Sequence, residues 1–358
     1  MQRNQKKTNL KKMSKNSLAY HQAIGEAIKS NMKKNNKVFV AGLEVNYSSK
    51  VFGSLEIPYK FFPKRFLQTP AMENGLCTIL AGAAINGLRP IFVNNRCDFL
   101  LLAFDSIVNI VDKWNYMFDG NAGKCPLIIT AVIGKGWGQG ATHSQSFHNF
   151  FSRLSGFDVF LPAFPEDVKN VYNYALKSNR PSIILHHRTL FNLKISPNKN
   201  KKLIYGKSNL IKKGRDLAII SVSFGVVQSL KVYEIMKKKY NKEITILDLI
   251  SLNPLDINTI LSIARSHKNF IILDIDHTVS GFASEISSLI HENFNGKKII
   301  KIGNNFSPAP VAENLEELFY PSEEKIVEYC CELLNIKRIK TFKKVNNFKD
   351  NYKFKGPY

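Results

Sequence analysis

Short apolar runs alternate with helical segments along most of the chain, and this alternation limits the possible folds more than any other feature. The apolar runs predict strands at 38–41, 90–93, 127–133, 157–161 and 182–186, and again at 217–222, 244–249, 270–274 and 299–302. Helices are predicted between them, including one over 74–86 and a long one from about residue 99. Strands that alternate with helices form mainly parallel sheets with helices on both faces. The sequence therefore predicts an α/β protein with two three-layer α/β/α domains.

Basic residues gather in three stretches outside these domains. The chain has 358 residues and a net charge of +23, of which residues 1–16, 188–215 and 337–358 carry +6, +9 and +7. We predict a basic tail at 1–16, a first domain at 17–187, a basic linker at 188–215, a second domain at 216–336 and a basic tail at 337–358. Because the domains themselves are nearly neutral, the charge indicates solvated tails and not a nucleic-acid groove, while binding of an acidic partner stays open.

The sequence does not indicate a membrane protein or a secreted one. The longest apolar runs, such as 99–104, are far shorter than the roughly 18 residues that a membrane span needs. The five cysteines form no CxxC pair, and their odd number argues against a disulfide framework or a zinc site. The N-terminal tail consists mainly of Lys and Asn and has one Arg and one Ser, whereas a mitochondrial presequence is rich in both. We expect a cytoplasmic protein.

Glu73 is the strongest candidate for a catalytic carboxylate. It comes directly before a helical segment, 74–84, which is so small-sided and apolar that another element must pack closely against it. We therefore expect the carboxylate to be half-buried. From the residues alone, a favourable interaction with the helix dipole explains a glutamate at this place better than catalysis does.

Several motifs in a fixed order favour a catalytic role of Glu73 over a role at the helix dipole. They are 67–70, Glu73, 82–84, 87–91, Asp98-Phe99, the glycine-rich run 134–140 with His143-Ser144-Gln145, Asn253-Pro254-Leu255-Asp256, 281–286 and 307–310. From about residue 17 to residue 334, the chain resembles the β subunits of the decarboxylating component of 2-oxo acid dehydrogenases, of the pyruvate dehydrogenase type. The resemblance implies a transketolase-like pyrimidine-binding domain, a transketolase C-terminal-type domain and thiamine diphosphate as cofactor.

The resemblance also implies roles for four side chains. Glu73 matches the glutamate that hydrogen-bonds a ring nitrogen of the cofactor's aminopyrimidine and so promotes loss of the thiazolium proton. Burial suits this role, because a carboxylate in an apolar pocket gains proton affinity. His143 matches a histidine that faces the reacting centre, where it can bind the substrate carboxylate or donate a proton. Phe99 matches the aromatic ring beside the pyrimidine, and Tyr116 matches a tyrosine of the same pocket.

The chain lacks the Gly-Asp-Gly motif with which α-type subunits of this family hold Mg²⁺ and the cofactor's diphosphate. The resemblance therefore implies an active site shared with an α subunit in an α2β2 assembly, and transfer of the acyl group to lipoamide on an acyltransferase core. We expect no metal site in this chain. The family's structural potassium site corresponds to Ser178 and Arg180, and the charge of Arg180 disfavours a second cation there.

Arg96 departs from the family pattern, and this departure affects which substrate we expect. It lies at the end of a predicted strand, where its planar guanidinium can bind a carboxylate or a phosphate. A salt bridge to Asp98 or to the α subunit explains it equally well.

We expect a 2-oxo acid dehydrogenase β subunit. The alternatives are a split transketolase-like enzyme that transfers a two-carbon or acyl unit to an aldehyde or sugar, and a non-catalytic scaffold with basic tails.

Overall fold

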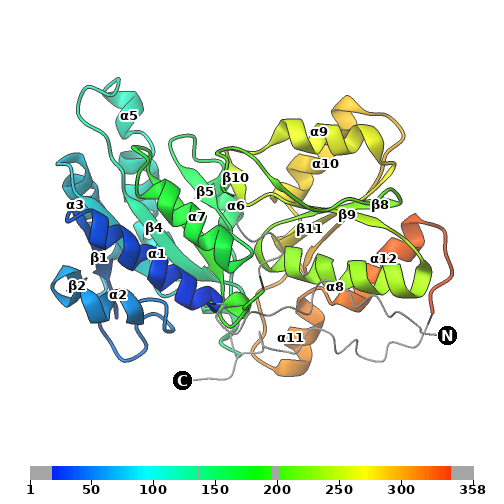
Figure 1. Cartoon of the computed structure of the whole chain (residues 1–358), viewed down its shortest axis with the longest axis horizontal. Helices are drawn as coiled ribbons and strands as arrows, with labels where there is room; N and C mark the ends of the chain where they lie inside the picture. The colour runs from blue at the N-terminus through cyan, green and yellow to red at the C-terminus, as the bar shows by residue number, and fades with distance from the viewer. Residues whose placement is uncertain (1–17, 136–137, 196–201, 340–358) are drawn as a thin grey trace, which may run out of the picture.

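The computed structural model describes residues 18–135, 138–195 and 202–339, so the predicted tail at 1–16 and most of the tail at 337–358 lie outside the described residues. Two sheets covered by helices lie next to each other (Figure 1). The predicted fold class, two mainly parallel α/β domains, is confirmed. In the part of the chain that is described, no helix is both long and apolar enough to cross a membrane.

The first sheet has seven strands in the order β10-β5-β6-β4-β3-β1-β2. They are β1 (Val38–Gly42), β2 (Phe66–Gln68), β3 (Arg89–Asn94), β4 (Ile128–Ile133), β5 (Asp158–Phe160), β6 (Ser182–His187) and β10 (Ser251–Asn253). All neighbours pair in parallel except β10, which runs antiparallel to β5. Strand β4 is buried along its whole length, as expected for a continuous apolar run between two helical layers. Parallel pairing brings the carboxyl ends of β2, β1, β3 and β4 to one edge of the sheet.

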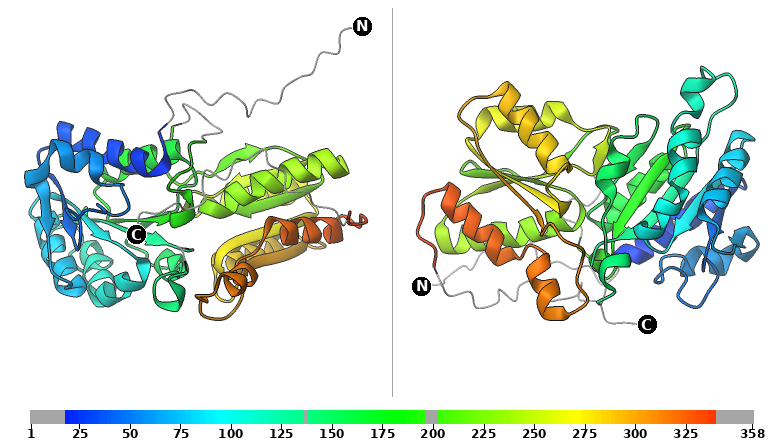
Figure 2. Two further views of the ribbon diagram at one scale, coloured as in Figure 1. Left: turned by 90° about the horizontal axis from the view of Figure 1, so that it is seen from below. Right: turned by 180° about the vertical axis from the view of Figure 1, so that it is seen from behind.

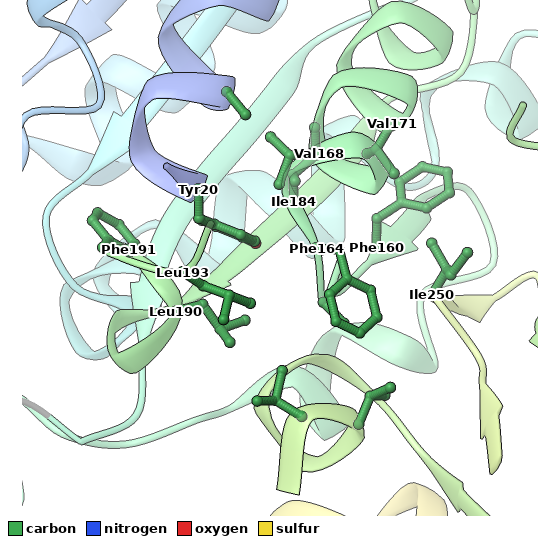
Figure 3. Close-up of a cluster of buried hydrophobic side chains, with 14 of the residues drawn as sticks. Tyr20, Phe160, Phe164, Val168, Val171, Ile184, Leu190, Phe191, Leu193 and Ile250 are labelled. Atoms are coloured by element: carbon green, nitrogen blue, oxygen red, sulfur yellow. The ribbon is translucent and has the colours of Figure 1, made fainter. Parts of the chain in front are cut away.

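Helices α1 (Tyr20–Lys34) and α7 (Pro165–Ala175) pack together on one face of this sheet (Figure 2). The hydroxyl of Tyr20 donates a hydrogen bond to the carbonyl of Pro162 at 3.0 Å. Tyr20 also belongs to an apolar core with Phe160, Phe164 and Ile184 (Figure 3). Helix α3 (Glu73–Ile85) packs with the turns that follow β3, and α2 (Glu56–Phe61) and η2 (Pro63–Arg65) connect β1 to β2.

The long helix predicted from about residue 99 consists of adjoining short helical elements of different types. They are α4 (Cys97–Leu100), η3 (Leu101–Ala103), the π-helical turn η4 (Ser106–Val111) and α5 (Trp114–Met117). The backbone N–H of Ser106 donates to Oδ1 of Asn74 at 3.1 Å. The hydrogen-bond pattern changes to a π-helical one at this residue, whose N–H bonds to a side chain of α3. The predicted helix is therefore present over residues 97–111, but it is irregular.

The second sheet has five strands in the order β12-β11-β8-β9-β7, in which β7 runs antiparallel to β9 and the other neighbours pair in parallel. The strands are β7 (Asn209–Lys212), β8 (Leu217–Ser221), β9 (Ile244–Asp248), β11 (Asn269–His277) and β12 (Lys298–Asn304). The helices are α8 (Ser223–Tyr240), α9 (Ile257–Ser266), α10 (Phe282–Asn293), α11 (Glu313–Phe319) and α12 (Glu323–Leu333). Figure 1 shows α8 and α12 on one face of this sheet and α9 and α10 on the other.

Two strands lie outside the boundaries that the sequence predicted. Strand β7 belongs to the second sheet, although its residues fall in the stretch 188–215 that we predicted as a linker. Strand β10 comes from the second half of the chain but pairs with β5, so that Ser251 lies opposite Phe160. Both are edge strands of three or four residues, too short for their pattern to stand out in the sequence. The two domains therefore share a strand as well as a connecting segment.

Buried polar side chains also join the two domains. Nε2 of His148, at the start of α6 (His148–Ser152), lies 2.9 Å from Oδ1 of Asp274 in β11, and both side chains are fully buried. The side chain of Asn149 accepts a hydrogen bond from the N–H of Phe282 in α10 at 2.9 Å. Burial lowers the pKa of His148, but the carboxylates of Asp274 and Asp276 outweigh it, so the pKa is raised above its ordinary value. Folding therefore favours the protonated imidazolium.

We predict that His148→Gln destabilises the folded chain by ~3 kcal/mol at about pH 6, because it removes the charge that faces the buried Asp274 carboxylate. A raised folded-state pKa means that the stabilisation is complete below the unfolded-state pKa of about 6.5 and is lost as the pH rises through the folded-state pKa. The destabilisation should therefore shrink toward alkaline pH.

Thermal unfolding of both forms between about pH 6 and pH 9 measures this effect. His291→Gln, at an exposed position of α10, is the control and should show no such pH dependence. A difference between His148→Gln and the unsubstituted chain that stays constant with pH would contradict the ion pair.

Candidate active site

A pocket of about 300 Å³ lies where β2 and β3 end and α3 begins. Glu73, the first residue of α3, and Phe99, in α4, both line it. Glu73 is half-buried, as the sequence predicted. The pocket lies at the carboxyl edge of the strands, where open α/β sheets bind ligands. Its position therefore suits a ligand.

Hydrogen bonds fix the start of α3 and with it the position of Glu73. Oδ1 of Asn74 accepts hydrogen bonds from the N–H and the hydroxyl of Ser106, which is fully buried. The hydroxyl of Thr78, one turn further along α3, lies 2.7 Å from the same serine oxygen. The π-helical turn η4 therefore serves as an anchor for the helix that carries Glu73.

Three buried polar atoms of the pocket residues have no hydrogen-bond partner among the described residues. They are Oγ1 of Thr69, Nδ2 of Asn94 and Oδ1 of Asn95. A buried polar group without a partner costs about 1–3 kcal/mol, so such groups normally meet a ligand or a water molecule. A pocket that combines a carboxylate, an aromatic ring and unpaired donors and acceptors fits a nitrogen heterocycle such as an aminopyrimidine.

His143 lies beside the same aromatic ring. The ring centroids of His143 and Phe99 are 5.1 Å apart, and the rings meet edge to face. Nδ1 of His143 is 2.8 Å from the hydroxyl of Thr142, and a hydroxyl that donates to Nδ1 leaves the hydrogen on Nε2, where it can be donated to a ligand. Phe99 thus connects the pocket of Glu73 to His143, so the structure brings these three predicted site residues together.

Arg96 is buried beneath the glycine-rich segment and is not among the residues that line the Glu73 pocket. Its side chain is 2% exposed, and its guanidinium donates hydrogen bonds to the carbonyl of Gly134 and to Oε1 of Gln139. Burial lowers the pKa of Arg96 to about 10, although the nearby Asp98 carboxylate opposes this shift. The guanidinium therefore faces the protein's own loop.

Tyr116 lies apart from this group. It belongs to α5, is 89% exposed and lines a different cavity, of about 1260 Å³, with the basic residues Lys113, Lys124 and Arg180. That cavity lies toward the amino ends of β4 and β6, whereas Glu73 follows the carboxyl end of β2. Within this chain, Tyr116 is therefore not brought to the Glu73 pocket.

Arg180 provides a fixed positive charge at the position that the family resemblance assigned to a potassium ion. Its Nε donates to Oδ1 of the buried Asp158 at 2.9 Å, and its Nη2 donates to the carbonyl of Ser155 at 3.1 Å. Burial lowers the pKa of Arg180, but the hydrogen bond and the charge of Asp158 outweigh it, so the pKa is raised. Arg180 thus compensates the carboxylate that a bound cation could otherwise neutralise.

Asn94, Asn95 and Ser106 contribute to the site, but we did not single them out from the sequence. The two asparagines did carry a signal, because they follow an apolar strand directly, at the edge where binding residues gather. Ser106 carried none. It lies inside an apolar helical pattern, and its bonds to Asn74 depend on packing between two segments that are far apart in the sequence.

The two α/β domains have a transketolase-like fold, and comparison with known families agrees. Residues 16–194 match the transketolase pyrimidine binding domain, and residues 206–326 match the transketolase C-terminal domain. A solved structure titled as an inactive β4 tetramer of a split-gene transketolase has a TM-score of 0.73 at 20% identity. The match covers 90% of this chain and 100% of that one, and at this identity it shows the fold.

Curated relatives identify the family within the transketolase-like proteins more closely. The pyruvate dehydrogenase E1 component subunit beta of Gracilaria tenuistipitata var. liui is 32% identical over 86% of this chain and 96% of its own length. The corresponding subunit of Rickettsia felis is 28% identical over 87% and 96%. The beta subunit of acetoin:2,6-dichlorophenolindophenol oxidoreductase from Cupriavidus necator is 29% identical over 85% and 94%. The chain therefore belongs to the family of E1 component β subunits, and the resemblance expected from its motifs is confirmed.

Gly134 is required at the carboxyl end of β4 for two reasons. Its φ is +74°, and a Cβ at this position would overlap the ring of His187. We predict that Gly134→Ala costs clearly more stability than the roughly 1 kcal/mol that left-handed backbone strain costs alone, because the buried His187 ring must also move. Gly296→Ala is the matched control, since φ is +71° there and a Cβ meets nothing within 4 Å.

The free energies of unfolding of the two variants, measured in urea, provide the test. Equal losses would show that the His187 ring yields without cost, which contradicts the tight packing described here.

Proposed function

We propose that this chain is the β subunit of a thiamine diphosphate-dependent 2-oxo acid dehydrogenase and that Glu73 activates the cofactor. The observation that carries the proposal is the pocket itself. It holds a half-buried carboxylate, an aromatic ring and unpaired buried polar atoms, and it lies next to His143. Each of these features matches a need of a bound aminopyrimidine.

Thiamine diphosphate supplies, when bound, the electron sink that decarboxylation of a 2-oxo acid requires. In our proposal, the Glu73 carboxylate shares a proton with a ring nitrogen of the pyrimidine. Phe99 orients that ring at a small cost in conformational entropy. His143 uses its Nε2–H to bind the substrate carboxylate or to donate a proton at the reacting carbon.

We propose that an α subunit completes the site. The sequence lacks the motif that holds the diphosphate and Mg²⁺ in this family. Large apolar side chains lie exposed around the start of α3, among them Met72, Ile79 and Leu102, of which Ile79 and Leu102 are 59% and 64% exposed. Exposed apolar surface of this kind is typical of a surface that a partner covers.

We propose a pyruvate-like 2-oxo acid as substrate and lipoamide as acyl acceptor, in line with the names of the relatives. The split-transketolase alternative depended on Arg96 as a phosphate or carboxylate clamp, and the contacts of its guanidinium with Gly134 and Gln139 weaken that argument. We propose a cytoplasmic location because all five cysteines are buried thiols, which suits a reducing compartment.

Substitution of the carboxylate tests the proposed role of Glu73. In the complex with the α subunit, Glu73→Gln should lower kcat by at least about 100-fold, because the amide cannot share a proton with the pyrimidine. The fold should be unaffected, since the substitution changes no volume. Glu56→Gln is the matched control, because Glu56 is also the first residue of a helix, α2, but lies outside the pocket. Unchanged turnover in Glu73→Gln would remove this residue from the mechanism.

Dependence on a lipoyl domain tests the proposed acceptor. With the α subunit, thiamine diphosphate and Mg²⁺ present, we expect reductive acylation of an added lipoyl domain by pyruvate. Multiple turnovers should stop when that domain is omitted. Sustained transfer to an aldehyde or a sugar without any lipoyl domain would instead identify the transketolase-like alternative.

A further inference from the structure

Three residues after β3 contact the glycine-rich segment that carries His143. Arg96 donates to the carbonyl of Gly134 and to the side chain of Gln139. Asp98 accepts a hydrogen bond from Nε2 of Gln145 at 3.1 Å. Phe99 meets the ring of His143 at 5.1 Å. Residues 96–99 therefore contact the segment before His143, at His143 and after it.

The glycine-rich segment has little secondary structure of its own to hold it. Between the end of β4 at Ile133 and the start of α6 at His148, the described residues form one short turn, η5 (Gly140–Thr142). Gly134, Gly138 and Gly140 all have positive φ values, between +70° and +74°, which only glycine adopts easily. Within the segment, the N–H of Gly134 donates to the carbonyl of Gln145 at 3.1 Å and the N–H of His143 donates to the carbonyl of Gly140 at 3.3 Å. Contacts from outside the segment add to these two bonds.

The second domain holds the same segment from the other side. Nζ of Lys135 lies 3.0 Å from Oε2 of Glu316 in α11, and the Glu316 side chain is 5% exposed. The hydroxyl of Tyr320 donates to the carbonyl of Ser144 at 3.4 Å. Residues 96–99 thus form the first-domain half of a clamp, and α11 with Tyr320 forms the second-domain half.

We infer that Arg96 and Asp98 are positioning residues that hold the glycine-rich segment so that His143 lies against Phe99. The Arg96 guanidinium is buried and donates to the segment itself, which favours this role over binding of a substrate carboxylate. A charged donor forms stronger hydrogen bonds than a neutral one, and its removal leaves a buried carbonyl unpaired. The functional meaning of the inference rests on the proposed role of His143, but the structural effect of Arg96 on the segment does not.

The experiment compares Arg96→Met with Arg89→Met in the complex with the α subunit. Arg89 is a matched control, because it lies at the other end of β3 and also donates to a loop carbonyl and an amide oxygen, those of Ser178 and Asn179. In Arg96→Met we expect faster hydrogen–deuterium exchange in peptides covering 138–148. In Arg89→Met we expect faster exchange around 178–180 and no change at 138–148.

The kinetic expectation for Arg96→Met is a fall in kcat by about 10- to 100-fold with KM changed by less than about threefold, as for loss of orientation at the transition state. Arg96→Lys, which keeps the charge but not the planar fork, should recover part of the loss. Gln139→Ala is the second variant if Arg96→Met does not fold, and it should raise exchange over the same peptides.

A rise in KM of tenfold or more, with kcat and exchange at 138–148 unchanged, would overturn the inference and make Arg96 a substrate-binding residue. The exchange measurement separates this inference from the proposed function. Faster exchange at 138–148 in a complex that has no 2-oxo acid activity, with or without the substitution, would support the clamp while the proposed function fails.

Discussion

Parallel pairing of β2, β1, β3 and β4 is the constraint on which the site depends. Because parallel strands all end at the same edge, Glu73 after β2, Phe99 after β3 and His143 after β4 lie close together despite separations of 26 and 44 residues in the sequence. The sheet supplies proximity but not orientation. Orientation comes from short polar contacts at the strand ends, where the chain leaves regular structure.

Two such sets of contacts orient the site residues. Asn74, Thr78 and Ser106 fix the first turn of α3 and so the position of the Glu73 carboxylate. Arg96 and Asp98 contact the segment after β4 and bear on His143. Phe99 lines the pocket of Glu73 and meets the ring of His143. Glu73 therefore lies at the start of a helix, whereas His143 lies on a loop.

Much of this arrangement could be predicted from the sequence, because strand periodicity reports burial and motifs report the family. The sheet class and the half-burial of Glu73 follow from local apolar patterns. The π-helical turn in the helix after β3 could not be predicted, since Ser106 bonds there to Asn74, which is far away in the sequence. The contacts of Arg96 could not be predicted either, because the sequence around a strand-end arginine does not show whether the side chain faces a ligand or a loop. The predicted site and the structure also differ at Tyr116, because its exposed ring lies away from Glu73 in the single chain.

The central claim is that the Glu73 carboxylate promotes deprotonation of the bound cofactor. The most direct measurement is the rate at which thiamine diphosphate, bound to the complex with the α subunit, exchanges its thiazolium proton for deuterium in the absence of substrate. We predict that Glu73→Gln slows this exchange by at least about 100-fold, while Glu56→Gln leaves it unchanged. Equal exchange rates in Glu73→Gln and the unsubstituted complex, with the cofactor bound in both, would contradict it.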